Sequence, residues 1–187
     1  MAVIQAPGAY AYKCEAESPR HKEQQEAYFE LDDHVVLTAE QRDTMNKLFE
    51  SLLGEWVGGV EDIICVPTGD SAKPYTNRGK ATAEIQVAAT GFLHIQVDKK
   101  YRDGPDETTS TIEILQLFGD DIIFELKVSK DSIYAVEKHR AKNVQRGSRL
   151  VESEITLTVN GRSLTIEISS FTNGYLVGKQ KLNLKRK

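Results

Sequence analysis

The sequence predicts an all-β protein: an antiparallel up-and-down barrel of about nine or ten strands, with one α-helix before the first strand. Three observations predict it: apolar and polar residues alternate from Trp56 onward, turn residues separate the alternating segments, and the connections are short. Alternation with a period of two residues buries one face of a strand and leaves the other in water. The alternating segments are 81–87, 93–97, 112–114, 124–128, 155–159, 164–168 and 182–184.

The turn residues predict hairpins. Asn160-Gly161 lies between two alternating segments, which is the strongest short signal for a hairpin, and Thr172-Asn173-Gly174 repeats the arrangement. Short connections make consecutive strands antiparallel neighbours. An open sheet of this length would leave two unpaired edges, so we expect it to close into a barrel. Between Ile133 and Val144 the alternation fails, and we expect a bulge or a long loop there.

A single helix is predicted between Thr38 and Gly54. Thr38 and Gln41 have the spacing of a capping box, in which each side chain accepts a backbone N–H of the other residue. Gly54 is a natural stop for the helix. One apolar stripe faces the barrel and consists of Met45, Leu48, Phe49 and Leu52.

Charge divides the chain into two parts. Its 187 residues and 20.9 kDa suit about one domain. Residues 1–37 hold seven acidic and three basic side chains, whereas acids and bases balance in the remainder. We therefore expect an acidic N-terminal arm over residues 1–37 and a barrel domain with its leading helix over residues 38–187.

Composition limits the partners and the compartment. A net charge of −4 argues against a nucleic-acid binder, and no apolar run approaches the ~20 residues of a transmembrane helix. Residues 2–6 are too short and lack the basic flank of a secretory signal, so a cytoplasmic location is expected. The alternative is a secreted or periplasmic protein whose signal has been removed. Cys14 and Cys65 are expected to be unrelated thiols, with a disulfide joining arm to body as the alternative.

Gly54-Glu55-Trp56, which directly follows the predicted helix, resembles the Gly-x-Trp signature of the calycin superfamily, which includes the lipocalins. The resemblance covers residues from about 45 to 187. It implies that Trp56 plugs the closed end of a barrel and that a basic side chain of the last strand packs over it. Lys185 or Arg186 matches that position, and we assign the role to Arg186. A cation–π contact of this kind contributes about 0.5–2 kcal/mol.

A narrower resemblance is to nitrobindin-type haem barrels of ten strands. It is carried by the opening Leu52-Leu53-Gly54-Glu55-Trp56-Val57-Gly58-Gly59 and by the closing Leu182-Asn183-Leu184-Lys185-Arg186. That family places its haem-ligating histidine at the start of the last segment. Here the stretch is Gly178-Lys179-Gln180-Lys181, without a histidine, so we carry over the fold and assign no cofactor.

Two glutamines are candidates for orienting a ligand. By alternation Gln116 shares a face with Ile112 and Ile114, and Gln180 shares a face with Leu182. An inward amide without a partner costs about 1–3 kcal/mol, so each needs a ligand or, alternatively, a water molecule. Apolar walls of the ligand site, or alternatively ordinary core residues, would be Phe118, Phe124 and Leu182.

No catalytic or metal-binding group of residues emerges from the sequence. None of the four histidines has a partner at metal-ligand spacing, and no serine or cysteine lies in a recognisable nucleophile motif. Residues 138–149 are basic and form either a patch for anions or membrane surfaces or, more simply, a solvated face.

We therefore expect a non-enzymatic binding protein that holds a small apolar or amphipathic molecule inside the barrel. One alternative is an interaction module with a filled core, which acts through its acidic arm and can form a homodimer. Another is a small haem-binding or isomerase-type barrel enzyme.

Overall fold

A computed structural model of the chain describes residues 14, 16–31, 34–65, 74–88, 91–102, 108–119, 122–143 and 147–187. Two short helical segments come first, and a longer helix leads directly into the strands. The helical segments are α2 (Pro19–Gln24), the 3₁₀ helix η1 (Gln25–Phe29) and α3 (Ala39–Leu52). The strands are β1 (Gly54–Ile64), β2 (Tyr75–Val87), β3 (Leu93–Arg102), β4 (Thr108–Leu117), β5 (Ile123–Val128), β6 (Ser132–Asn143), β7 (Gly147–Asn160), β8 (Ser163–Thr172) and β9 (Tyr175–Arg186).

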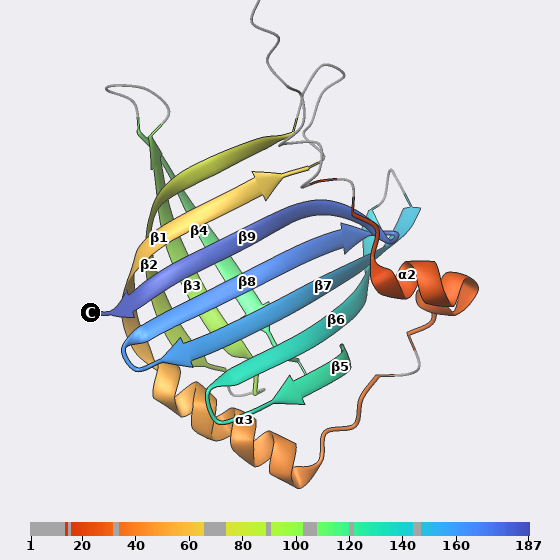
Figure 1. The fold of residues 1–187 in the computed structure, drawn as a ribbon, viewed down its shortest axis with the longest axis horizontal. Helices are drawn as coiled ribbons and strands as arrows, with labels where there is room; N and C mark the ends of the chain where they lie inside the picture. The colour runs from red at the N-terminus through yellow and green to blue at the C-terminus, as the bar shows by residue number, and fades with distance from the viewer. Residues whose placement is uncertain are drawn as a thin grey trace, which may run out of the picture.

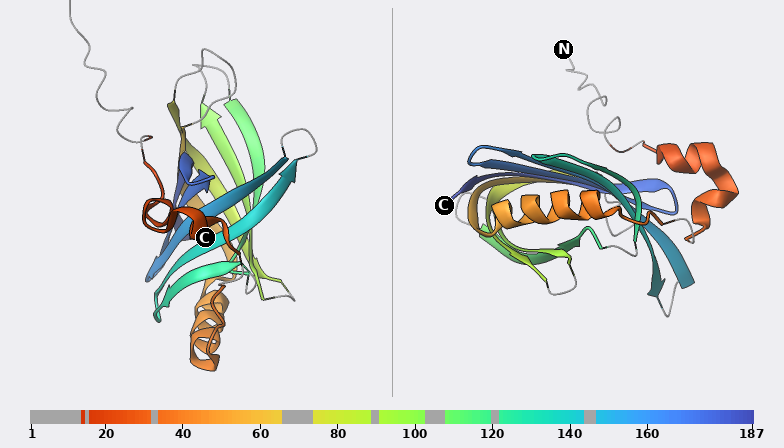
Figure 2. Two further views of the ribbon diagram at one scale, coloured as in Figure 1. Left: turned by 90° about the vertical axis from the view of Figure 1, so that its right-hand side faces the viewer. Right: turned by 90° about the horizontal axis from the view of Figure 1, so that it is seen from below.

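The nine strands form one antiparallel sheet, which confirms the predicted fold class. Its order is β4-β3-β2-β1-β9-β8-β7-β6-β5, so the first and last strands pair while every other neighbour is consecutive in the chain. The sheet curls upon itself (Figures 1 and 2). Over the residues that the structure describes, β4 and β5 remain its two edges without a ladder between them. The fold is therefore barrel-like. We had expected hydrogen bonds to close the barrel, and over the described residues they do not.

Helix α3 lies across the lower opening of the curled sheet (Figure 2, right). The predicted capping box starts it: the Thr38 N–H donates to Gln41 Oε1 at 2.9 Å, and the Gln41 N–H donates to Thr38 Oγ1 at 3.2 Å. The predicted stripe is buried in the core. Trp56, at the start of β1, is buried beside it and donates from Nε1 to the Leu52 carbonyl at 2.8 Å.

The last strand reaches the same place. Trp56 and Arg186 are register partners of β1 and β9, and the guanidinium carbon lies 4.8 Å from the centre of the indole ring. Arg186 also donates to the Ser51 carbonyl at the end of α3. The helix, the first strand and the last strand thus meet at one tryptophan.

Side chains inside the sheet change character with height above α3. Residues in register across neighbouring strands point to the same face, so each row of partners forms one layer of the interior. The lowest complete layer is wholly buried and apolar, and it consists of Leu182, Ile166, Leu157 and Ile133. The layer above it consists of Gln180, Ile168, Ile155 and Ala135.

The third layer is small and polar. It consists of Gly178, Ser170, Ser153 and Glu137. Large apolar side chains therefore fill the lower half of the interior, whereas glycine, serines and a glutamate leave the upper half incompletely filled.

Alternation gave the wrong face for β4. Ile112 and Ile114 are 70% and 58% exposed, and Gln116 is exposed on the same side. The inward residues are instead Glu113, Leu115 and Leu117. Glu113 can point inward because a lysine on the neighbouring strand meets it there.

No long loop lies at 133–143, contrary to one of our two expectations. Strand β6 pairs with β7 in continuous register over these residues. The expected irregularity lies on the opposite neighbour, where the register of β5 shifts between Ile123 and Glu125. Alternation fails in β6 because both of its faces are covered, so that Ala135, Val136, Glu137 and Lys138 are all buried.

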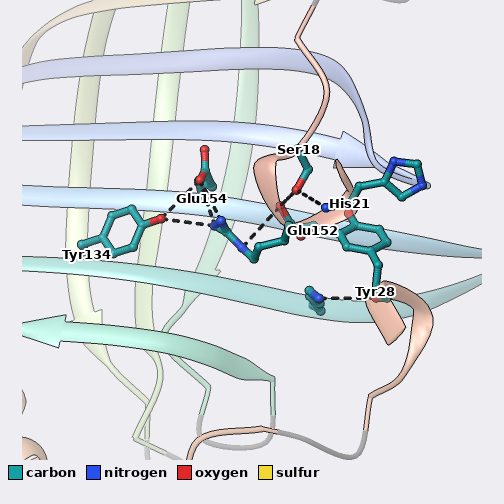
Figure 3. Close-up of polar contacts among 8 residues, drawn as sticks. Ser18, His21, Tyr28, Tyr134, Glu152 and Glu154 are labelled. Carbon is teal, nitrogen blue, oxygen red and sulfur yellow. Dashed lines mark hydrogen bonds and ion pairs between the residues drawn. The ribbon is translucent and has the colours of Figure 1, made fainter. Parts of the chain in front are cut away.

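Helices α2 and η1 cover the outer face of β6 and β7 through a buried polar cluster (Figure 3). Ser18 donates to Glu152 at 2.7 Å, and Arg20 donates to Glu154 at 2.8 Å. Lys138 donates to the Tyr28 carbonyl at 3.3 Å, and its ammonium lies 4.4 Å from the centre of the Tyr28 ring. The segment is thus packed against the sheet.

A disulfide fixes this segment as well. Cys14 and Cys65 are bonded, with 5.3 Å between their Cα atoms, so the expectation of two unrelated thiols was wrong. Fifty-one positions separate them, and neither their spacing nor their flanking residues signalled a bond. The covalent link joins the N-terminal segment to the end of β1.

We expect the Cys14→Ser, Cys65→Ser double variant to lose about 2–4 kcal/mol of unfolding free energy, because the bond restricts a long loop of the unfolded chain. Urea denaturation of both proteins, with wild type under reducing conditions as the control, measures this. Equal midpoints for oxidised and reduced wild type would contradict it.

The contact over Trp56 makes a second prediction. Arg186→Met is expected to lower the unfolding free energy by about 1 kcal/mol through loss of the cation–π contact. Lys185→Met is the matched control, since Lys185 is the exposed neighbour on the same strand. The same destabilisation in both variants would show that the indole contact is not the cause.

Candidate ligand cavity

A cavity of about 440 Å³ occupies the upper half of the interior. Ile155 and Ile168 form its apolar floor, directly above the packed layer that contains Leu182. Ser153, Ser170 and Gly178 line the wall above the floor. The cavity exists because the third layer carries no large side chain.

A charged cluster from four strands forms one side of this cavity. Lys99 of β3 is only 6% exposed, and its ammonium contacts Asp62 of β1 at 3.2 Å and also the Glu113 carboxylate of β4. Gln180 of β9 donates from Nε2 to Asp62 at 3.1 Å and to Glu113 at 2.8 Å. Tyr101 donates its hydroxyl to Asp62. Two carboxylates thus share one ammonium.

Two features of the cluster bear on what it can bind. Burial, followed by the hydrogen bond to Asp62, raises the pKa of Tyr101, so this residue stays a neutral donor. The Oε1 atom of Gln180 is buried and has no hydrogen-bond partner within the described part of the chain. A buried acceptor without a donor costs about 1–3 kcal/mol, which a ligand N–H or O–H, or a water molecule, would recover.

Glu137 is a further carboxyl in the cavity lining, contributed by β6. It is 5% exposed and accepts a hydrogen bond from the Phe118 N–H just beyond the end of β4. Burial raises the pKa of Glu137 from its ordinary value of 4.5 to about 7, and hydrogen bonds from the Phe118 and Gly119 backbones oppose part of the rise.

The cavity reaches the unpaired edge of β4. Its lining includes residues 113–117 of that strand, so that inward Leu115 and outward Ile114 both border it. Ile122 and His139 lie on the other border. Access from solvent therefore coincides with the break in the sheet between β4 and the β5–β6 hairpin.

The predicted site residues divide into two groups. Gln180 lies in the charged cluster, and Gln116 borders the cavity from the outer face of β4, not from the inner face as predicted. Leu182 lies one layer below the floor. Phe118 is 1% exposed and stacks on Phe49 of α3, with 5.7 Å between ring centres. The structure thus places Leu182 and Phe118 in the packed core rather than along the cavity.

Phe124 also lies away from the cavity. Its ring is on the outer side of β5, 5.1 Å from the Lys138 ammonium beneath the N-terminal segment. The register shift in β5 at this position explains why alternation assigned it to the wrong face.

Sequence reasoning missed the partners of Gln180 in the charged cluster, and it missed Glu137. Lys99 and Tyr101 continue the alternation of Leu93, Ile95 and Val97, and extending that pattern by two steps would have found them. Nothing local marks the other three as inward residues: Asp62, Glu113 and Glu137. In the described residues no group of three potential metal ligands occurs. Among the helices that the structure describes, none could span a lipid bilayer.

Comparisons with known proteins add little to this geometry. No protein-family model matches the chain, and no curated protein is significantly similar to it. A solved structure from Nostoc punctiforme, a protein of unknown function from the DUF3598 family, is similar with 16% identity and a TM-score of 0.29. The match covers 74% of this chain and 49% of that one, so the chain spans about half the length of that protein.

The raised pKa of Glu137 predicts a pH-dependent stability. Glu137 favours folding while it is protonated, so its contribution is complete below pH 4.5 and is lost as the pH rises through about 7. Between roughly pH 4.5 and pH 8, we expect the unfolding free energy of wild type to fall by about 1–3 kcal/mol relative to that of Glu137→Gln. Urea denaturation across this range measures the difference. If the difference in unfolding free energy between wild type and Glu137→Gln stayed constant across this pH range, the pKa of Glu137 would not be raised in the folded protein.

Proposed function

We propose that the chain is a calycin-like binding protein that holds a small amphipathic molecule in its interior cavity. The observation that carries the proposal is the unfilled volume of about 440 Å³ above a fully packed lower core. Ligand cavities in proteins span about 300–1,000 Å³, so this one can hold a molecule of modest size.

The lining supports an amphipathic ligand over a purely apolar one. Ile155, Ile168 and Leu115 offer apolar contact, which contributes about 25 cal/mol for each Å² removed from water. Asp62, Glu113 and Gln180 offer polar contacts on another side. A molecule with an apolar body and a polar group would meet both surfaces.

The calycin assignment is part of the proposal. It is supported by the position of Trp56 at the base of β1, by Arg186 over its ring and by the pairing of the first strand with the last. These features match what the Gly-x-Trp resemblance implies for the closed end of a barrel.

An interaction module is the second candidate, because exposed Ile112 and Ile114 lie on the unpaired edge strand β4. Edge strands with apolar side chains are prone to pair with another chain. Against this candidate stands the cavity, since a module of that kind needs no hollow interior.

Adjacent serines of β8 provide the test. Ser170 lines the cavity, whereas Ser169 lies on the outer face of the same strand. We expect Ser170→Phe to fill the cavity and weaken binding of the fluorescent probe N-phenylnaphthylamine at least about tenfold. Ser169→Phe should bind the probe as wild type does.

Thermal unfolding and circular dichroism show whether both variants fold. The proposal fails if wild type does not bind the probe or if the two folded variants bind it equally well. Light scattering of wild type in the same experiment reports a dimer, which would favour the interaction module.

A further inference from the structure

We propose that the polar group of the ligand is a protonated amine, so that the cavity selects a small amphipathic cation. This inference rests on the proposed function and adds the chemical class of the ligand. It follows from which hydrogen-bonding atoms of the cavity are already engaged and from the balance of charge around them.

The donor groups of the charged cluster are already engaged. The Lys99 ammonium contacts both carboxylates, the Tyr101 hydroxyl donates to Asp62, and the Gln180 amide nitrogen donates to Asp62 and to Glu113. In this cluster a carboxylate or a phosphate would find at most the third N–H of the Lys99 ammonium, because the other two are engaged. The Ser153 and Ser170 hydroxyls of the lining can donate or accept, so they favour neither kind of ligand.

Acceptors, in contrast, remain. Gln180 Oε1 is buried without a partner among the described residues. Within the described part of the chain, the contacts of the Glu113 carboxylate with Lys99 and Gln180 both use Oε2, which leaves Oε1 to accept a hydrogen bond. A primary ammonium carries three N–H donors and no acceptor, which suits a charged cluster whose remaining capacity is mainly to accept.

The charges favour the same ligand. Asp62 and Glu113 share the single positive charge of Lys99, which leaves the cluster negative. The other titratable lining groups are Glu137, which is only partly charged at neutral pH because burial raises its pKa to about 7, and His139 and Lys179, which are exposed to solvent. An anionic head group would lie against two carboxylates that share one lysine, and like charges at this distance repel.

Lys99 therefore differs from a lysine that is poised to bind a fatty acid. Its side chain is almost fully buried between the two carboxylates, and removing it from them would leave both without their counter-ion. Separating a buried ion pair is strongly unfavourable. The lysine serves to hold the carboxylates in place, and the unneutralised charge is left for the ligand.

Three probes with one body test the inference: phenylbutylamine, phenylbutanol and phenylbutyrate, which are cationic, neutral and anionic at neutral pH. Isothermal titration calorimetry should give the amine an affinity at least about tenfold higher than that of the alcohol, and the carboxylate the weakest affinity.

Variants then locate the preference. Glu113→Gln keeps the side-chain shape on an edge strand and should reduce the amine-to-alcohol affinity ratio about tenfold, because it removes a negative charge that only the amine needs. Gln180→Met removes the unpartnered acceptor and should also reduce the amine-to-alcohol affinity ratio. It provides an independent test if Glu113→Gln does not fold. The matched control is Glu167→Gln, because Glu167 is half-exposed on the outer face of β8 and pairs with Lys181.

The outcomes separate the two proposals. If phenylbutyrate or phenylbutanol binds as tightly as the amine and Ser170→Phe still abolishes that binding, the cavity binds ligands and the amine inference is overturned. If Glu167→Gln changes the ratio as much as Glu113→Gln does, the preference arises from overall charge, which also overturns it. If none of the three probes binds, the amine inference fails, and the N-phenylnaphthylamine experiment decides whether the proposed function fails with it.

Discussion

The contact between Trp56, helix α3 and Arg186 is the constraint on which the rest of the structure depends. The indole N–H is satisfied by the Leu52 carbonyl, so a large aromatic ring can be buried at the base of the sheet without an unpaired donor. Arg186 covers the ring from the last strand, at the point where β9 pairs with β1. This contact lies where the first strand meets the last, and their pairing joins strands β1–β4 and β5–β9 into one sheet.

Because the lower end is filled by this contact, the upper end can be hollow. The apolar layer that contains Leu157, Ile166 and Leu182 holds the strands together below the cavity. Lys99 and Asp62 form a buried ion pair. Apolar residues of similar size in place of such a pair often leave the stability unchanged or raise it, so stability alone explains the charged cluster poorly. Residues that depart from the choice that would be best for stability are typical of functional sites.

The sequence was sufficient for the local features and insufficient for the contacts between distant segments. Alternation, hairpin turns and the capping box depend on neighbouring residues, and with the exception of β6 the strands and α3 formed where these predicted them. The inward position of Glu113 depends on Lys99 of the next strand, while two β-branched isoleucines beside it indicated the opposite face. Phe118 could not be placed either, because it leaves the strand with a φ of 66° and enters the core beside α3.

The same reasoning explains why β6 was not recognised as a strand. Its outer residue Lys138 is covered by the N-terminal segment, and its inner residue Glu137 faces the cavity, so neither face shows the alternation of a half-exposed strand. These two residues are consecutive, which means that the segment packed outside and the cavity inside share one wall. The disulfide acts on the opposite border in the same way, since Cys65 directly follows Ile64 of the cavity lining. The N-terminal segment therefore holds two walls of the cavity in place, although none of its described residues lines the cavity.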